Sequence, residues 1–100
     1  MDKTTDLLST YACTLTYEQL PARVVQHVKR TLIDTVGCAL GGFKMEPSRM
    51  ARRMARQCSC SSPARVLCTN DLSTEDAACF ANGCMIRCLD FNDAYPSLSG

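Results

Sequence analysis

The chain has 100 residues, of which 46% are hydrophobic and 21% are charged, and its eleven basic and ten acidic residues leave a net charge of +1. This composition excludes a disordered chain, and the near-zero net charge argues against nucleic acid as the main partner. No apolar run approaches the roughly 18 residues of a membrane span, and the N-terminus does not resemble a secretory signal, so we expect one domain at most and a cytoplasmic location.

Two helices are predicted in the first part of the chain. The first covers about residues 6–14, with Thr5 as its N-cap, because apolar side chains recur along one stripe. The second begins at Pro21, a residue suited to a first helical turn, and apolar residues four positions apart continue it to Leu40. Glycine is common just beyond a helix C-terminus, so we expect Gly41 and Gly42 to end this helix.

A third helix is predicted over about residues 48–57, after Pro47. It has a basic face, formed by Arg49, Arg52, Arg53 and Arg56, and an apolar face opposite to it. The basic face is either an anion-binding strip or the solvated side of an amphipathic helix, and the lack of interleaved aromatic residues favours the solvated side. The segment PARVLC after this helix is either a short strand or an extended connector, and a lone strand would have to pair outside the chain.

The fourth helix is predicted to begin at Ser73, because Ser-Thr-Glu-Asp over residues 73–76 forms a capping arrangement. The stretch AACFANGCMIRCL that follows is apolar on nearly every side, which is typical of a helix surrounded by protein. Its polar or side-chain-free positions fall on one helical strip, and they are Asp76, Gly83, Arg87 and Asp90. This strip either lines a cleft or forms the solvent edge of the helix.

Eight cysteines are spread along the chain. A disulfide framework needs an oxidising compartment, and zinc sites prefer paired C-x2-C motifs, which the sequence lacks. We therefore expect reduced, buried cysteines that pack as small apolar residues, with zinc binding as the alternative. Cys58 and Cys60, in a serine-rich loop, are predicted to be the most exposed to oxidation.

The segment CLDFNDAYPS near the C-terminus contains a polar cluster around Phe91. Asp90, Asn92 and Asp93 offer too few oxygens for calcium and lack the EF-hand spacing, so we predict neither a metal nor a cofactor. The one histidine, His27, lies on the polar side of the second helix and is predicted to be an ordinary surface residue, which leaves a nucleophilic triad unsupported. From the residues alone, the acids are either loop-capping or catalytic.

Two blocks of the sequence, LPARVVQHVKRTLIDTVGCALGG and STEDAACFANGCMIRCLDFNDAYPS, resemble the N-terminal part of the MmgE/PrpD family, which includes 2-methylcitrate dehydratase and cis-aconitate decarboxylase. The resemblance spans about residues 7–97. It implies an all-α fold, made of the opening helices of a large helical domain: about four helices with one short extended segment. Family members are several times longer, carry a smaller α/β lid domain and usually form homodimers. Residues 1–100 are therefore expected to be an incomplete helical domain, from either a truncated piece or a degraded gene.

The resemblance also implies site residues. Asp90, the first residue of the DFND block, is expected to be catalytic, and the substrate-binding residues are expected to be Arg87, Asn92, Asp93 and Ala94. Ala94 stands where many members have threonine, and Arg87 stands where histidine is frequent. An arginine at this position would either grip a substrate carboxylate in a bidentate manner or pair with Asp90.

The function that the resemblance implies is that of a metal-independent carboxylic-acid lyase acting on a di- or tricarboxylic acid. DFND is closer to dehydratase-like members, which suggests elimination of water from 2-methylcitrate in propionate catabolism, and a cis-aconitate decarboxylase-like member is the alternative. The histidines and lysine of the family's site follow the DFND block beyond Gly100, so we predict no turnover by these 100 residues alone. The alternative from a different functional class is a non-catalytic helical interaction module, which binds a partner chain through its apolar faces.

Overall fold

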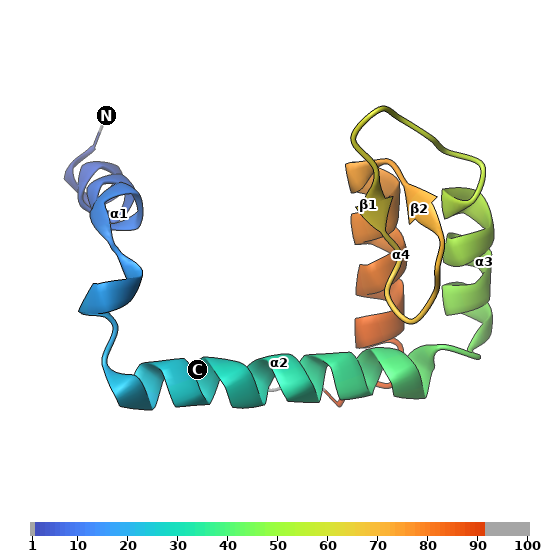
Figure 1. Ribbon diagram of the computed structural model, residues 1–100, viewed down its shortest axis with the longest axis horizontal. Helices are drawn as coiled ribbons and strands as arrows, with labels where there is room; N and C mark the ends of the chain where they lie inside the picture. The colour runs from blue at the N-terminus through green and yellow to red at the C-terminus, as the bar shows by residue number, and fades with distance from the viewer. Residues whose placement is uncertain (1, 92–100) are drawn as a thin grey trace. The chain divides into compact units, whose positions relative to one another are not determined.

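The computed structural model describes residues 2–91, and these form helices with one small sheet (Figure 1). The elements follow in the order α1, η1, α2, α3, β1, β2 and α4, which confirms the predicted all-α class with four α-helices. The chain divides into two compact units, Met1–Arg30 and Thr31–Gly100. Over residues 2–91, no helix combines the length and the apolar character that crossing a membrane requires.

The first unit contains α1 (Lys3–Thr14), the short 3-10 helix η1 (Tyr17–Gln19) and the start of α2 (Ala22–Gly42). α1 begins earlier than predicted because Asp2, and not Thr5, is its N-cap. The carboxylate of Asp2 accepts hydrogen bonds from the backbone N–H of Thr5 at 3.0 Å and from its hydroxyl at 2.8 Å. No residue of α1 is buried.

α2 ends at Gly42, as predicted, but for a different reason. No glycine among residues 2–91 has a positive φ, so the glycine pair does not end the helix with left-handed backbone. Gly42 is buried, and a Cβ on it would overlap the carbonyl oxygen of Met85 and lie 3.1 Å from the Cβ of Cys88. The missing side chain therefore lets the end of α2 approach the last turn of α4.

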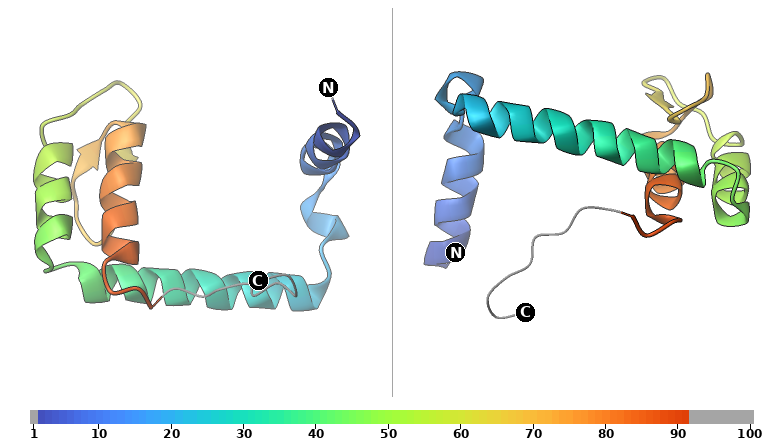
Figure 2. Two further views of the ribbon diagram at one scale, coloured as in Figure 1. Left: turned by 180° about the vertical axis from the view of Figure 1, so that it is seen from behind. Right: turned by 90° about the horizontal axis from the view of Figure 1, so that it is seen from below.

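The second unit is built around α3 (Glu46–Ala55) and α4 (Glu75–Arg87), which lie side by side in each view (Figures 1 and 2). α3 starts before Pro47, which occupies its first turn. Most of the buried residues between the two helices are small, and the core consists of Ala39, Ala51, Ala55, Val66, Ala77, Ala78, Ala81 and Met85. Such small side chains allow the helix backbones to come close together.

α4 is not surrounded by protein on every side, contrary to the prediction from its apolar sequence. Its buried face packs against α3 and the hairpin, whereas Cys79 and Phe80 are exposed, and Phe80 has 56% of its surface accessible. The apolar face of α3 is likewise incomplete, since Met50 and Met54 are 57% and 45% exposed. These two helices therefore bury one flank and leave apolar side chains accessible on the other.

A short antiparallel hairpin follows α3, with β1 (Ala64–Arg65) paired to β2 (Leu72–Ser73). The predicted extended segment thus has a partner inside the chain, and Ser73 lies in that partner strand instead of starting the fourth helix. The N-cap of α4 is Thr74. Ser73 is fully buried, and its hydroxyl donates a 2.6 Å hydrogen bond to the carbonyl oxygen of Ala55 at the end of α3.

Asn82 of α4 fastens the hairpin to the helix. Its Oδ1 accepts a 2.8 Å hydrogen bond from the backbone N–H of Leu67, and its Nδ2 donates a 3.3 Å bond to the carbonyl oxygen of Arg65. A hairpin with two-residue strands is marginal by itself. The hydrogen bonds of Asn82 and Ser73 with the backbone therefore add stability that two short strands cannot provide.

The basic face predicted for α3 is divided in the structure. Arg49, Arg53 and Arg56 are exposed, as expected of a solvated side, but only 8% of Arg52 is accessible. Nη1 of Arg52 donates a 2.6 Å hydrogen bond to the carbonyl oxygen of Phe43, and its guanidinium carbon lies 3.7 Å from the centre of the Phe43 ring. Arg52 therefore binds the connection between α2 and α3.

Candidate active site

The two described residues that were predicted to act on substrate meet at the C-terminal end of α4. This helix ends at Arg87, and a turn through Cys88 and Leu89 leads to Asp90. Nη2 of Arg87 lies 3.0 Å from Oδ1 of Asp90, and the backbone N–H of Asp90 donates a 3.1 Å hydrogen bond to the carbonyl oxygen of Arg87. Of the two alternatives for Arg87, the structure shows the pairing with Asp90, and Asp90 reaches it from a turn and not from the helix.

The backbone of Asp90 is left-handed, with a φ of 55°. Few residues other than glycine adopt this conformation, although aspartate and asparagine tolerate it better than most. Backbone of this kind is found at functional sites, where surrounding contacts hold a residue in an otherwise disfavoured geometry. The turn therefore gives Asp90 a defined orientation.

The pair is open to solvent. The side chains of Arg87 and Asp90 are 64% and 80% exposed. An ion pair this accessible adds less than about 1 kcal/mol to stability, because water screens it. A small molecule carrying carboxylates can therefore reach both groups.

The predicted polar strip does not form one site along its whole length. Asp76 lies in the first turn of α4, about 16 Å from Arg87 at the usual rise per residue. The Thr74 hydroxyl, and then the backbone N–H of Ala77, hold the pKa of Asp76 below its ordinary value, which is the behaviour of a residue that stabilises a helix start. Gly83 lies nearer to the pair, and a Cβ on it would meet no atom of residues 2–91 within 4 Å, so none of these residues fills the space above that position.

Three predicted substrate-binding residues, Asn92, Asp93 and Ala94, lie outside the described residues. Their roles stay predictions. His27 is exposed on α2, as expected of a surface histidine.

The eight cysteines are free thiols, but most are not buried as predicted. Cys38 is the one buried cysteine, and the exposed ones are Cys13, Cys60, Cys68 and Cys79. Cys58, predicted to be exposed, is only partly so. Among residues 2–91, no group of three or more histidine, cysteine or acidic side chains is placed to hold a metal ion.

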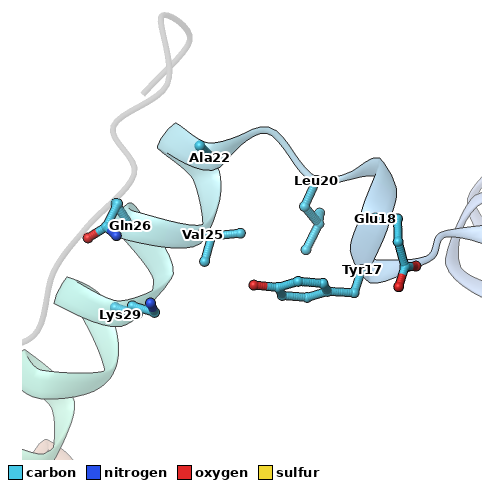
Figure 3. Close-up of a pocket in the computed structure, with 7 residues that line it drawn as sticks. All are labelled: Tyr17, Glu18, Leu20, Ala22, Val25, Gln26 and Lys29. Atoms are coloured by element: carbon cyan, nitrogen blue, oxygen red, sulfur yellow. The ribbon is translucent and has the colours of Figure 1, made fainter.

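A hollow of about 620 Å³ lies in the first unit, at the corner between η1 and α2 (Figure 3). It is lined by Tyr17, Glu18, Leu20, Ala22, Val25, Gln26 and Lys29, and the Tyr17 ring points towards Val25. Except for the partly buried Leu20 and Val25, these residues are exposed, so the hollow holds no buried polar group that would orient a ligand. None of the predicted site residues lies in it.

A second hollow, of about 560 Å³, follows the accessible flank of α3 and α4 in the second unit. Met50 and Met54 of α3 and Phe80 and Cys84 of α4 line most of it. Its lining is almost wholly apolar. Glu46 contributes its one carboxylate, and the rest of the lining offers mainly packing surface.

Reasoning from the sequence missed several residues that shape the site and its support, namely Cys38, Gly42, Ser73 and Asn82. Each acts through a partner far away in the sequence, such as the carbonyl oxygen of Phe91, which lies 3.7 Å from the Sγ of Cys38. One sequence signal could have indicated two of them, Gly42 and Asn82. The glycine pair and the FANG segment stand in the two blocks that carry the family resemblance.

Comparison with known domain families matches residues 6–99 to the MmgE/PrpD N-terminal domain. The matched region contains both sequence blocks and the Arg87–Asp90 pair. A search of curated proteins found no match, and a search of solved structures found none either. The match covers nearly the whole sequence, and the chain therefore belongs to the MmgE/PrpD family, of which it carries the N-terminal domain.

Proposed function

We propose that this chain forms one wall of the active site of a metal-independent carboxylic-acid lyase, and that the lyase removes water from a tricarboxylic acid of the 2-methylcitrate type. The observation that carries the proposal is the accessible pair of Arg87 and Asp90 at the end of α4, in a chain of the MmgE/PrpD family. The pair combines a proton acceptor with a cation that binds carboxylates. Elimination from a hydroxy acid needs both.

Arg87 binds and orients the substrate in this proposal. Its planar guanidinium carries five N–H donors, so it can hold Asp90 through Nη2 and a substrate carboxylate through other N–H groups. This double contact would place the carbon next to the substrate carboxylate beside Asp90. Arg87 could therefore bind a substrate carboxylate and pair with Asp90 at the same time.

Asp90 acts on the proton at that carbon. Its carboxylate either accepts the proton directly or orients the group that accepts it, while the hydroxyl on the neighbouring carbon leaves as water after protonation. The proposal includes Asn92 and Asp93 as substrate contacts and Ala94 as a position that offers no hydroxyl. The acid that protonates the leaving group is expected after the DFND block, as the family resemblance implies.

The first test measures turnover of 2-methylcitrate by the chain joined to the C-terminal part of an MmgE/PrpD dehydratase. Asp90→Asn is expected to lower kcat by about 10²–10⁴-fold, the usual contribution of acid–base catalysis, because the amide cannot take up the proton. Asparagine also tolerates left-handed backbone, so the circular dichroism spectrum should stay unchanged. Arg87→Lys should mainly raise KM, because lysine loses the bidentate geometry.

Asp34→Asn is the matched control, because Asp34 is an exposed carboxylate on α2 and lies outside the proposed site. The control should keep the rate of the unmodified protein. If Asp90→Asn were as active as this control, Asp90 would have no catalytic role. Product analysis separates the two lyase reactions, because decarboxylation releases carbon dioxide and dehydration does not.

The competing function is a helical interaction module, and the exposed apolar side chains favour it as the second candidate. Leu32, Ile33 and Leu40 of α2 are 58%, 74% and 60% exposed, on a helix whose apolar stripe has few partners among residues 2–91. A domain that only binds another chain would keep its binding when Asp90 is replaced. The same Asp90→Asn comparison therefore decides between the two functions.

A further inference from the structure

The turn that carries Asp90 is held by α2 on both sides of that residue. Before it, Leu89 packs over Gly41, where a Cβ would lie only 2.9 Å from the Cδ1 of Leu89. After it, the carbonyl oxygen of Phe91 accepts a hydrogen bond from the thiol of Cys38, with 3.7 Å between sulfur and oxygen. One helix thus restrains both neighbours of Asp90.

The last turn of α4 is fixed by the same helix. Gly42 is buried against the carbonyl group of Met85 and against Cys88, and there is no room for a side chain. The backbone from Met85 to Phe91 therefore follows the C-terminal end of α2. Arg87, which pairs with Asp90, lies within this stretch.

These restraints account for the left-handed backbone of Asp90. A non-glycine residue with a φ of 55° persists only where its surroundings determine the conformation. The contacts of Leu89 and Phe91 with α2 lie on either side of Asp90 and tie the turn to the rest of the unit.

We propose that Cys38, Gly41 and Gly42 are positioning residues for Asp90. They touch no substrate, and they act by holding Leu89, Phe91 and the end of α4 so that the carboxylate of Asp90 faces the substrate. This inference rests on the catalytic role proposed for Asp90. The GCALGG segment would then position Asp90 in addition to ending α2.

The inference is tested first by NMR on the 100-residue chain. A strong NOE between the amide proton and Hα of the same residue marks positive φ, and we expect it at Asp90 in the unmodified protein. Cys38→Ala removes the thiol donor, and Gly41→Ala pushes the Leu89 side chain away, so both variants should weaken this NOE. Cys38→Ser keeps a donor and should restore it.

Two control variants separate positioning from general damage. Gly37→Ala makes the same change in the same helix, at a position where a Cβ meets no atom of the described residues within 4 Å, and Cys79→Ala removes an exposed thiol from α4. Both should leave the NOE of Asp90 unchanged. The amide signals of α3 and α4 in the same spectra report whether each variant is folded.

Kinetics provide the second readout, in the joined protein used for turnover. Cys38→Ala should lower kcat by about ten- to a hundredfold, the scale on which a small misplacement of a reacting group acts, and should leave KM nearly unchanged. Cys38→Ser should recover most of the rate. A merely structural role would change the yield of folded protein and not this division between kcat and KM.

The outcomes distinguish this inference from the proposed function. If Cys38→Ala and Gly41→Ala both kept the NOE of Asp90, the inference would be overturned whatever the activity. If Asp90→Asn abolished turnover but Cys38→Ala left kcat unchanged, the inference would again be overturned while the proposed function stood. If the NOE responded as expected but Asp90→Asn stayed fully active, the positioning would hold and the lyase function would be wrong.

Discussion

The second unit contains two buried serines, and only one of them forms a hydrogen bond through its hydroxyl within the described residues. The hydroxyl of Ser73 donates to the carbonyl oxygen of Ala55, whereas the hydroxyl of Ser48 has no hydrogen-bond partner among the described residues. Both side chains are fully buried. The same substitution is therefore expected to act differently at the two positions.

Ser73→Ala should lower the free energy of unfolding by about 1 kcal/mol, the net value of a buried hydrogen bond. The loss is limited because the carbonyl oxygen of Ala55 also accepts the backbone N–H of Cys58 at 3.1 Å. Ser48→Ala should leave stability equal or higher, because it removes an unsatisfied buried hydroxyl. Urea denaturation measures both, with the exposed Ser62→Ala as control, and equal losses at the two buried serines would contradict the assignment.

At the scale of single residues, the sequence could predict contacts between neighbours but not contacts between elements. The ion pair of Arg87 and Asp90 was one of two alternatives that the sequence offered, because three positions bring side chains together in a helix or a turn. The partner of Ser73 is a backbone carbonyl 18 positions away, and no side-chain pattern identifies a backbone acceptor. Arg52 was assigned to the solvated face for the same reason, since its partners are the carbonyl oxygen and ring of Phe43.

At the scale of elements, the start of α4 depends on an ionised carboxylate. The pKa of Asp76 is lowered from 3.8, first by the Thr74 hydroxyl and then by the backbone N–H of Ala77. Because its folded pKa lies below this unfolded value, the ionised group contributes stability that is fully present above the unfolded pKa. This contribution is lost as the pH falls through the folded pKa.

Stability should therefore decline as the pH is lowered below about 4, and Asp76→Asn should reduce that decline. Thr74→Val, which removes the largest cause of the shift, should have the same effect in smaller measure. The measurement is a series of urea denaturation curves between about pH 6 and pH 3. Glu75→Gln removes a charge from the same helical turn, and an equal effect of that control would exclude the Thr74 hydroxyl as the cause.

The long helices could be predicted from the sequence because apolar residues recur with the helical period over many turns. The hairpin could not, because strands of two residues contain no measurable alternation, and Ser73 also fits a helix cap. The end of α2 was predicted at the right place, but the glycines allow close packing against α4 and do not adopt left-handed backbone. A glycine pair indicates both helix termination and close helix packing, and only the position of Met85 distinguishes the two.

At the scale of the whole molecule, the chain exposes many large apolar side chains while carrying little net charge. Ile33 is 74% exposed and Phe80 is 56% exposed, and the sequence pI is about 7.5. Apolar surface promotes association, and a net charge of +1 provides little repulsion against it. We expect the chain to self-associate near neutral pH.

Sedimentation velocity over a range of concentrations measures this association. Ile33→Lys should reduce it, because a charge replaces the most exposed large apolar side chain of α2. His27→Lys adds a charge to the polar face of the same helix and should have much less effect. If the chain stayed monomeric at every concentration, these exposed apolar side chains would not drive self-association.

Membership of the family could be predicted from two blocks of sequence, and the structure adds that the two blocks meet. The end of the first block contains Cys38 and Gly42, and the second block contains Met85, Cys88 and Phe91, with which they make contact. The predicted substrate contacts at positions 92–94 lie outside the described residues. The sequence could therefore predict which segments carry the family resemblance but not how one segment holds the other.

The contact of Cys38 with Phe91 also bears on the order of folding. It joins residues 53 positions apart, and closing a loop of that length costs more chain entropy than closing the four-residue loop of a helical hydrogen bond. Local contacts form faster than distant ones, so α2, α3 and α4 are expected to exist before this contact closes. The orientation of Asp90 is then acquired late, and during synthesis it becomes available only after Phe91 has been added.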